Sequence, residues 1–532
     1  MNYSTGKLSF IFMLAVLLSL LGAWWVARRY RVAMRRLMSA PAAPSALAAG
    51  VAAPTPEPLP EALPVTARDN RRAGYRLALL LVALSALISL SSAAIQLHVV
   101  MAGKVFSANR LLTLAFIQLW PVIPALGLLW RWSRWRVAGA LVSWFMVCFP
   151  LVLWRSIESR PWEVLAYLSF EIGPPMLLAA VVCLGGATRA IAPWLLLPMI
   201  GLVWASLTGL DMIALMLPHP PGWFMTLTGW LGAHAVMALF ALLPWLLAWW
   251  PLKQLGRALA HAYTRKLLSE LMVLFTALWG ISLLAKALMA ASDMGLGGAV
   301  LLLPLAWIPA PMSVSARLHE RAGRAPTLLV LRVFQHDERI QALFDHVIER
   351  WRLTGNTLLI AGTDLIERTL DADDIFTFID GRLAARFIQD PADLPARLAA
   401  FDMARDAEGR FRVNECYCHD TTWQPTLAAL VQRSDVVLMD LRSFKAHNQG
   451  CEHELGVLAR APRIRRVVLL TDGDTDRDAA RAATQGAPDG RFVWLDTARI
   501  DRAKRREVLE SLFVAGGSGQ ARGLGEPHPT MT

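Results

Sequence analysis

Cysteine is scarce in this sequence, with five residues in a chain of 532. Cys148 and Cys183 lie within apolar runs, whereas Cys416, Cys418 and Cys451 lie in a more polar part of the chain. Five scattered cysteines exclude a disulfide scaffold and favour a reducing compartment. The sequence also lacks a glycine-rich phosphate-binding loop between a strand and a helix, which excludes P-loop nucleotide chemistry.

Charged residues are sparse before residue 313 and normally distributed after it. Hydrophobic residues make up 55% of the chain, which also holds 21 tryptophans. This balance predicts a membrane region followed by a soluble region. The net charge of +12 does not indicate a nucleic-acid partner, because many arginines lie in short clusters beside apolar runs, where they set membrane topology.

The membrane region is predicted to hold about nine spans, so the lipid bilayer is the first expected partner. Residues 1–36 form an N-terminal anchor, because its apolar run, Leu8 to Val26, is followed rather than preceded by arginines. Residues 37–75 are rich in alanine and proline and predict an extended linker. Residues 76–313 then form a polytopic domain of about eight spans. The arginine and lysine asymmetry predicts an outside N-terminus and a cytoplasmic C-terminal domain.

Four ionisable residues fall inside these apolar runs: Glu171, Asp211, His234 and Lys286. Such residues raise the hypothesis of a transporter with a regulatory domain. The structural alternative is that they pair helices with one another, or, for Lys286, reach toward the membrane surface.

Residues 325–515 alternate between strand and helix patterns and predict a flavodoxin-like α/β domain. Five strands are expected in a parallel sheet, at residues 328–334, 357–361, 435–439, 466–470 and 492–495. Phe411 to Cys416 is a candidate extra strand, and an insertion is expected at about 371–420. Residues 516–532 form a glycine-rich tail that predicts disorder.

The chemistry is expected in the stretch from Ser434 to Gly456. Val436 to Met439 form a buried strand, a polar loop follows, and Gly450 opens an amphipathic helix that carries Glu452 and Glu454. A strand, a loop and a helix with carboxylates place a ligand site at the carboxyl edge of an α/β sheet.

Three pieces of this region resemble a TIR (Toll/interleukin-1 receptor) domain. They are Leu331 to Asp337 at the opening strand, Thr357 to Asp364 at the place of the BB loop, and Ser434 to Leu455. Cys451-x-x-Glu454-Leu455 has the TIR spacing, with Gly450 in the place of a tryptophan. The stretch Gly450 to Gly456 is also similar to nucleoside deoxyribosyltransferase-like proteins, which share the fold type.

The TIR resemblance implies hydrolysis of the N-glycosidic bond of NAD, with Glu454 as the catalytic carboxylate and NAD as substrate rather than cofactor. It also implies activation by self-association and, by analogy, a defence role at a bacterial inner membrane. Independently of the family, a carboxylate can stabilise the oxocarbenium-like centre of such a reaction. Glu452 is expected on another helix face, so Glu454 is preferred. The alternative is that both are solvated acids of the first helical turn.

Further residues are candidates for substrate binding: Asp440, Arg442, Asp364, Cys451 and Trp423. Asp440 and Arg442 follow the central strand and could contact a ribose or phosphate, or simply pair with each other. Trp423 could stack on a base or pack. No metal is predicted, although Cys416, Cys418, His419, His447, Cys451 and His453 are zinc-ligand types. A non-catalytic TIR-like signalling module remains an alternative function.

Overall fold

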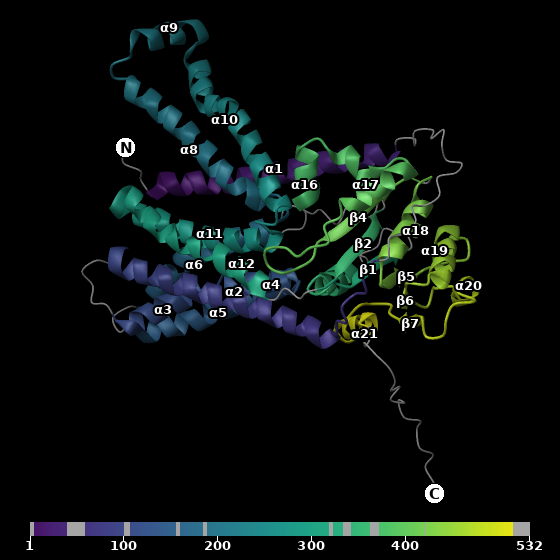
Figure 1. Cartoon of the computed structure of the whole chain (residues 1–532). Helices are drawn as coiled ribbons and strands as arrows, with labels where there is room; N and C mark the ends of the chain where they lie inside the picture. The colour runs from purple at the N-terminus through teal and green to yellow at the C-terminus, as the bar shows by residue number, and fades with distance from the viewer. Residues whose placement is uncertain are drawn as a thin grey trace.

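The computed structural model describes residues 5–39, 59–100, 107–155, 160–184, 189–318, 323–332, 342–361, 372–419 and 421–513. These residues form a bundle of apolar helices beside an α/β part with a seven-stranded parallel sheet (Figure 1). The division into an apolar helical region and an α/β region, expected from hydropathy, is confirmed. The predicted tail 516–532 lies outside the described residues.

The helical region runs from α1 to α12. Its helices are α1 (Thr5–Ser39), α2 (Ala67–Ile95), α3 (Ala108–Gln118), α4 (Val122–Leu129), α5 (Arg134–Arg155), α6 (Pro161–Leu184), α8 (Ala192–Met216), α9 (Gly222–Leu231), α10 (Ala233–Thr264), α11 (Glu270–Met294), the 3-10 helix η2 (Gly295–Trp307) and α12 (Pro309–Leu318).

Within the part of the chain that the structure describes, eight helical segments are long and apolar enough to cross a membrane, or nine if the bent pair α3–α4 counts as one span. Asp211 on α8 forms an ion pair with Lys7 on α1. This pairing fits the structural alternative for an ionisable group among apolar helices. The side chain of Glu171 lies outside the described residues.

The helices extend further into the predicted linker 37–75 than expected. Helix α1 continues to Ser39 and α2 begins at Ala67, where Thr66 and Asp69 form a capping box that satisfies the first backbone N–H groups. Residues 59–66 are not helical, yet Val65 is buried, and Leu63 donates a backbone hydrogen bond to Arg324. The end of the linker therefore packs on the α/β part instead of remaining unpacked.

The α/β part contains seven strands and the helices between them. Its elements are β1 (Thr327–Arg332), the π-helix η3 (Phe344–Ile348), α14 (Glu349–Trp351), β2 (Asn356–Ala361), α16 (Ala372–Ile379), β3 (Phe387–Ile388), α17 (Leu394–Ala399), β4 (Val413–Cys418), α18 (Trp423–Arg433), β5 (Val436–Asp440), α19 (Gln449–Arg460), β6 (Arg466–Thr471), α20 (Arg477–Ala483), β7 (Phe492–Asp496) and α21 (Arg502–Leu512).

The strand order is β3-β4-β2-β1-β5-β6-β7, and every pairing is parallel. The prediction of five strands is therefore wrong. The insertion supplies β3 and β4, which extend the sheet beyond β2. Strand β4 was only half expected because its sequence, VNECYC, lacks the continuous apolar run of a buried strand, and β3 has only two residues. The five expected strands keep the order second, first, third, fourth, fifth.

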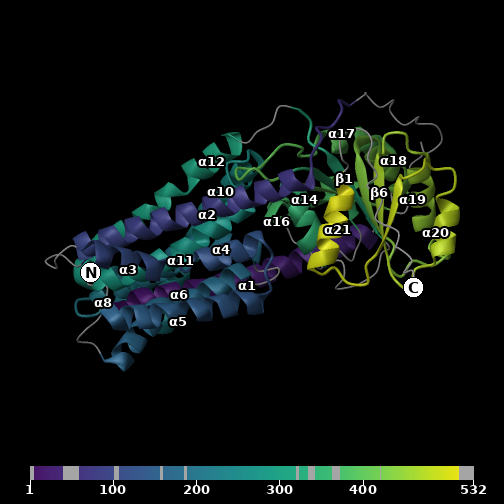
Figure 2. The ribbon, with the colours of Figure 1, turned by 90° about the horizontal axis from the view of Figure 1, so that it is seen from below.

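The two faces of the sheet belong to different cores. Leu328, Val330 and Leu438 join an apolar cluster that continues into the bundle, through residues such as Tyr30 of α1 and Phe275 of α11. Their neighbours in the strands point the other way, toward α18, α19 and α20. Figure 2 shows α21 between the bundle and the sheet, and α18 to α20 on the side away from the bundle. The sheet is thus held directly against the helical region.

Candidate functional site

The site expected at the carboxyl edge of the sheet lies where the strand order reverses. Strand β1 has β2 on one side and β5 on the other, and the last residues of β1 and β5, Arg332 and Asp440, are paired in register. The connections leaving these two strands run in opposite directions across the sheet, and doubly wound sheets bind their ligands at the carboxyl ends of such strands. Helix α19, which follows β5, carries Glu454.

Glu454 is buried, whereas Glu452 is exposed. This difference follows from helical periodicity, because residues two positions apart project about 200° apart around the axis. Leu455 and Leu458 pack the inner face of α19 into the core, and Glu454 lies on the same face. The alternative that both acids are solvated does not hold for Glu454.

The carboxyl group of Glu454 is poorly compensated. Within the described residues, its Oε2 atom is buried and has no hydrogen-bond partner. Burial raises the pKa of this carboxyl to about 8, and the positive charge of Arg332 only partly opposes the effect. The carboxyl group of Glu454 is therefore mostly protonated near neutral pH. A buried polar atom without a partner costs free energy, so the Oε2 atom needs an explanation.

Arg332 was missed by sequence reasoning. It ends an apolar strand and is buried. A charged residue at the carboxyl end of a buried strand is a weak sequence signal, and only the pairing of β1 with β5 brings it near Glu454.

Asp440 and Arg442 pair with each other. The Arg442 Nε atom donates to Asp440 Oδ1 at 2.8 Å and Nη2 donates to Oδ2 at 2.5 Å, and both side chains are buried. The backbone N–H of Ser443, which has a φ of 61°, donates to Asp472 Oδ1 at 3.0 Å. These bonds fix the loop that leads from β5 to α19, so the two residues shape the site.

Three further residues were candidates for substrate binding. Cys451 is buried, and burial together with the charge of Glu454 raises the pKa of its thiol to about 12, so it is no nucleophile at neutral pH. Trp423 packs edge to face against His453 with ring centroids 5.4 Å apart, a contact between α18 and α19. Asp364 lies outside the described residues.

The cysteines and histidines that were considered as zinc ligands do not come together in the structure. Among the residues that it describes, no group of three or more His, Cys, Asp or Glu side chains could hold a metal ion. Cys416 lies buried in β4, and burial raises the pKa of its thiol. The acidic turn after β6 is closed by its own hydrogen bonds, since Asp472 Oδ1 accepts from the Asp474 backbone and from Thr475 Oγ1.

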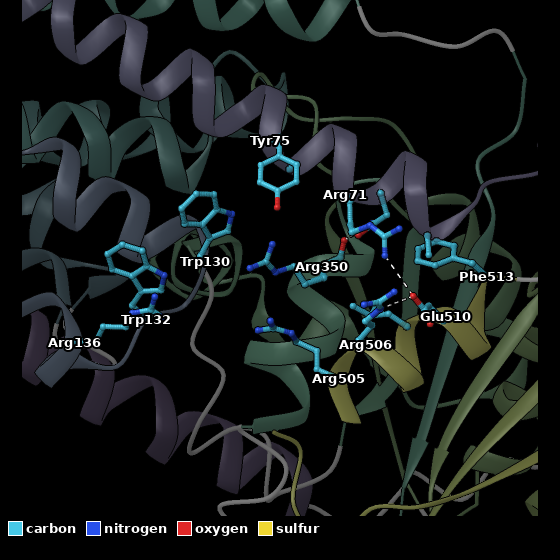
Figure 3. Close-up of a pocket in the computed structure, with 14 residues that line it drawn as sticks. Arg71, Tyr75, Trp130, Trp132, Arg136, Arg350, Arg505, Arg506, Glu510 and Phe513 are labelled. Atoms are coloured by element: carbon cyan, nitrogen blue, oxygen red, sulfur yellow. Dashed lines mark hydrogen bonds and ion pairs between the residues drawn. The ribbon is translucent and has the colours of Figure 1, made fainter. Parts of the chain in front are cut away.

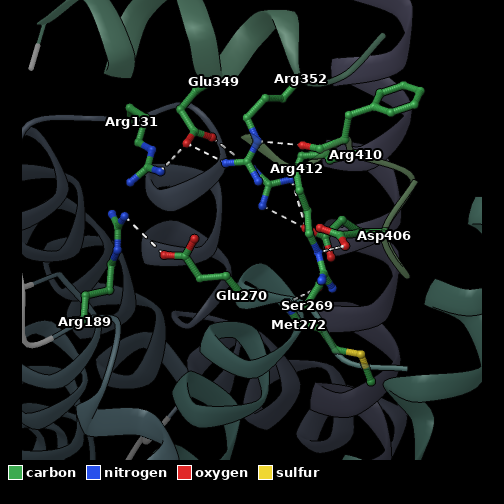
Figure 4. Close-up of polar contacts among 12 residues, drawn as sticks. Arg131, Arg189, Ser269, Glu270, Met272, Glu349, Arg352, Asp406, Arg410 and Arg412 are labelled. Carbon is green, nitrogen blue, oxygen red and sulfur yellow. Dashed lines mark hydrogen bonds and ion pairs between the residues drawn. The ribbon is translucent and has the colours of Figure 1, made fainter. Parts of the chain in front are cut away.

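Another carboxyl group, Glu349, lies where the bundle meets the α/β part, with 13% of its side chain exposed (Figure 4). Glu349 accepts from Arg131 Nη2 at 2.6 Å, from Arg352 Nη1 at 2.9 Å and from Arg410 Nη1 at 3.1 Å. Burial alone would raise the pKa of Glu349, but these three guanidinium groups lower it well below its ordinary value. Arg131 belongs to the connection between α4 and α5, so this network joins the two regions.

Comparisons with protein-family models, with curated proteins and with solved structures find no match to this chain. The TIR resemblance therefore depends on the residues quoted for it alone.

Proposed function

We propose that the α/β part is a TIR-like enzyme that hydrolyses the N-glycosidic bond of NAD, held at a membrane by the helical bundle. The observation that carries the proposal is Glu454: a buried carboxyl group with an unpartnered oxygen, beside the point where the strand order reverses. The flavodoxin-like order of β2, β1, β5, β6 and β7 supports it, because nucleotides bind such sheets at that point.

The proposed reaction needs one carboxylate and no metal. The bond between C1′ of the ribose and the nicotinamide nitrogen breaks, and its electron pair neutralises the positive nicotinamide ring as it leaves. Glu454 in its ionised form stabilises the positive charge that develops at C1′. Water then adds to C1′ and releases a proton, which gives ADP-ribose and nicotinamide.

The raised pKa of Glu454 is compatible with this role. The group is mostly protonated when the site is empty, because burial disfavours its charge. The positive nicotinamide ring would favour the ionised form once NAD is bound. The substrate therefore generates the carboxylate that it requires, and the protein avoids a permanent buried charge.

The finer features of the proposal come from the sequence. The spans would lie in a bacterial inner membrane with the N-terminus outside and the α/β part in the cytoplasm, as the arginine distribution favours. Activation would follow self-association, as the TIR resemblance implies, and the biological role would be defence.

The test is nicotinamide release from NAD by the full-length protein in nanodiscs and at increasing density in liposomes. Glu454→Gln keeps the size of the side chain and removes its charge, and we expect turnover to fall roughly a hundredfold to a thousandfold. Glu452→Gln, on the exposed side of the same helix, is the matched control and should keep parental turnover.

Other outcomes decide between the alternatives. Turnover of nucleosides but not of NAD would indicate a nucleoside deoxyribosyltransferase-like enzyme. A folded, clustered parent protein that turns over neither substrate would contradict the proposal and favour a signalling module.

A further inference from the structure

A pocket of about 600 Å³ lies in the seam between the helical bundle and the α/β part (Figure 3). One wall comes from the first turns of α2 and from the connection between α4 and α5, and the other comes from α14 and α21. Helices α14 and α21 pack with the sheet face that meets the bundle, whereas α19 packs on the opposite face. This pocket is thus separate from the Glu454 site.

The described residues that line the pocket are rich in positive charge. Five arginines line it, namely Arg71, Arg136, Arg350, Arg505 and Arg506, against one carboxylate, Glu510. Glu510 accepts from Arg506 Nε at 2.8 Å and from Arg71 Nη1 at 3.4 Å. Arginine thus outnumbers carboxylate among the described lining residues, which favours an anion over a cation as the ligand.

Arg350 and Arg505 are half-buried, whereas the other three arginines are exposed. Burial and the charge of Arg505 together lower the pKa of the Arg350 guanidinium to about 10, against the opposing effects of Tyr75 and Glu349. Arg350 lies against Gly74 of α2, where a Cβ atom would stand 3.9 Å from Arg350 Nη1. Holding like charges together in a partly dry place costs free energy unless an anion compensates them.

The pocket lies at the ends of the apolar helices. Its lining includes Trp130 and Trp132 from the end of α4, and the Arg136 guanidinium lies over the Trp132 ring at 4.5 Å. Tryptophan and arginine are enriched at the level of the lipid headgroups. The two walls are tied together by Asn70 of α2, whose Nδ2 donates to the Arg350 carbonyl at 2.7 Å.

We propose that this seam pocket binds a phosphate-bearing anion, either the headgroup of an anionic phospholipid or a soluble pyrophosphate compound. The volume suits a small ligand, and guanidinium groups are the preferred partners of phosphate oxygens. Because the pocket needs walls from both regions, such a ligand binds only when the bundle and the α/β part are docked. Binding therefore stabilises the docked arrangement, and this holds whether or not the α/β part cleaves NAD.

The experiment is thermal unfolding of the delipidated full-length protein in neutral detergent. Phosphatidylglycerol is compared with phosphatidylcholine at equal mole fraction, and inorganic pyrophosphate is compared with sodium chloride at equal ionic strength. We expect phosphatidylglycerol, pyrophosphate or both to raise the midpoint of the parent protein. A response to the lipid alone identifies a headgroup site, and a response to pyrophosphate alone identifies a soluble ligand.

The decisive variant is Arg350→Gln combined with Arg505→Gln. We expect it to weaken the apparent affinity for the active probe about tenfold or more, because guanidinium–phosphate pairs are charge-assisted. Arg382→Gln removes a positive charge far more exposed to solvent, with 73% of its side chain accessible, and should leave the response unchanged. If the double variant does not fold, the exposed Arg136→Gln and Arg506→Gln make the same test. An equal response in parent and pocket variants, or no response to either probe, would overturn the proposal.

Discussion

Glu349 and Glu454 are both carboxyl groups of the α/β part that are largely shielded from solvent, yet their surroundings differ. Three guanidinium groups bind Glu349, and the pKa of its carboxyl is well below the ordinary value. The charge of Arg332 only partly compensates Glu454, whose Oε2 atom has no partner among the described residues and whose pKa is raised to about 8. Burial is common to both, so the compensation of the charge makes the difference.

The difference bears on the role proposed for each group. Glu349 connects Arg131 of the bundle with Arg352 and Arg410 of the α/β part. Within the described residues, the Oε2 atom of Glu454 has no partner, near the edge where nucleotides bind doubly wound sheets. Perturbed groups of this second kind are the better candidates for chemistry.

The comparison predicts opposite effects on stability when each charge is removed. Glu349→Gln removes the carboxylate that Arg131, Arg352 and Arg410 share, and it should destabilise the protein by about 3 kcal/mol or more. For an α/β part of this size, that loss corresponds to a fall of about 6 °C or more in the unfolding midpoint. Thermal unfolding of the full-length protein in detergent measures it.

Two controls accompany this measurement. Glu349→Asp keeps the charge and should recover part of the loss. Glu454→Gln at neutral pH should match the parent or exceed its midpoint, because it replaces a group that burial already keeps mostly neutral. If both Gln variants lowered the midpoint equally, the distinction between the two carboxyl groups would be lost.

A further effect concerns pH. The folded pKa of Glu454, about 8, lies above the ordinary value of 4.5, so the folded state holds its proton more tightly than the unfolded state. The resulting stability is fully present below pH 4.5 and is lost as the pH rises toward 8, by about 1.4 kcal/mol per pH unit. The free energy of unfolding of the Glu454→Gln variant does not fall with pH in this way. Midpoints of parent and variant at pH 5, 6.5 and 8.5 should therefore diverge in favour of the variant, and a constant difference would contradict the raised pKa.

Much of the fold follows from local sequence. The apolar runs that end at Met439 and Leu470 are strands because fully buried parallel strands need continuous apolar residues. The inward face of Glu454 follows from its position one residue before Leu455 in an amphipathic helix. The two strands of the insertion are different. Strand β4 is amphipathic and β3 is very short, and both exist because β2 offers an unpaired edge.

The charged contacts between the two regions could not be predicted. Arg131 and Glu349 are 218 residues apart, and no periodicity links a loop between apolar helices to the helix after β1. Arg332 was missed for the same reason, since its relation to Glu454 depends on the pairing of β1 with β5. Local sequence patterns determine the helices, the strands and their buried faces. The charged contacts depend on how these helices and strands pack against one another.

The smallest expected effect concerns Arg332, the one cation that opposes the raised pKa of Glu454. Arg332→Gln removes that charge, so the pKa of Glu454 should rise by about one unit, while Arg332→Lys should keep it near the parental value. The reference for each Arg332 variant is the double variant that also carries Glu454→Gln. The free energies of unfolding of the two proteins are compared across pH, and the readout is the pH at which their difference stops growing. A general loss of stability from the Arg332 change is common to both proteins and cancels. That pH should move above 8 in Arg332→Gln only. If both Arg332 variants level off at the same pH, the charge of Arg332 does not act on Glu454, and the site holds a single ionisable group rather than an opposed pair.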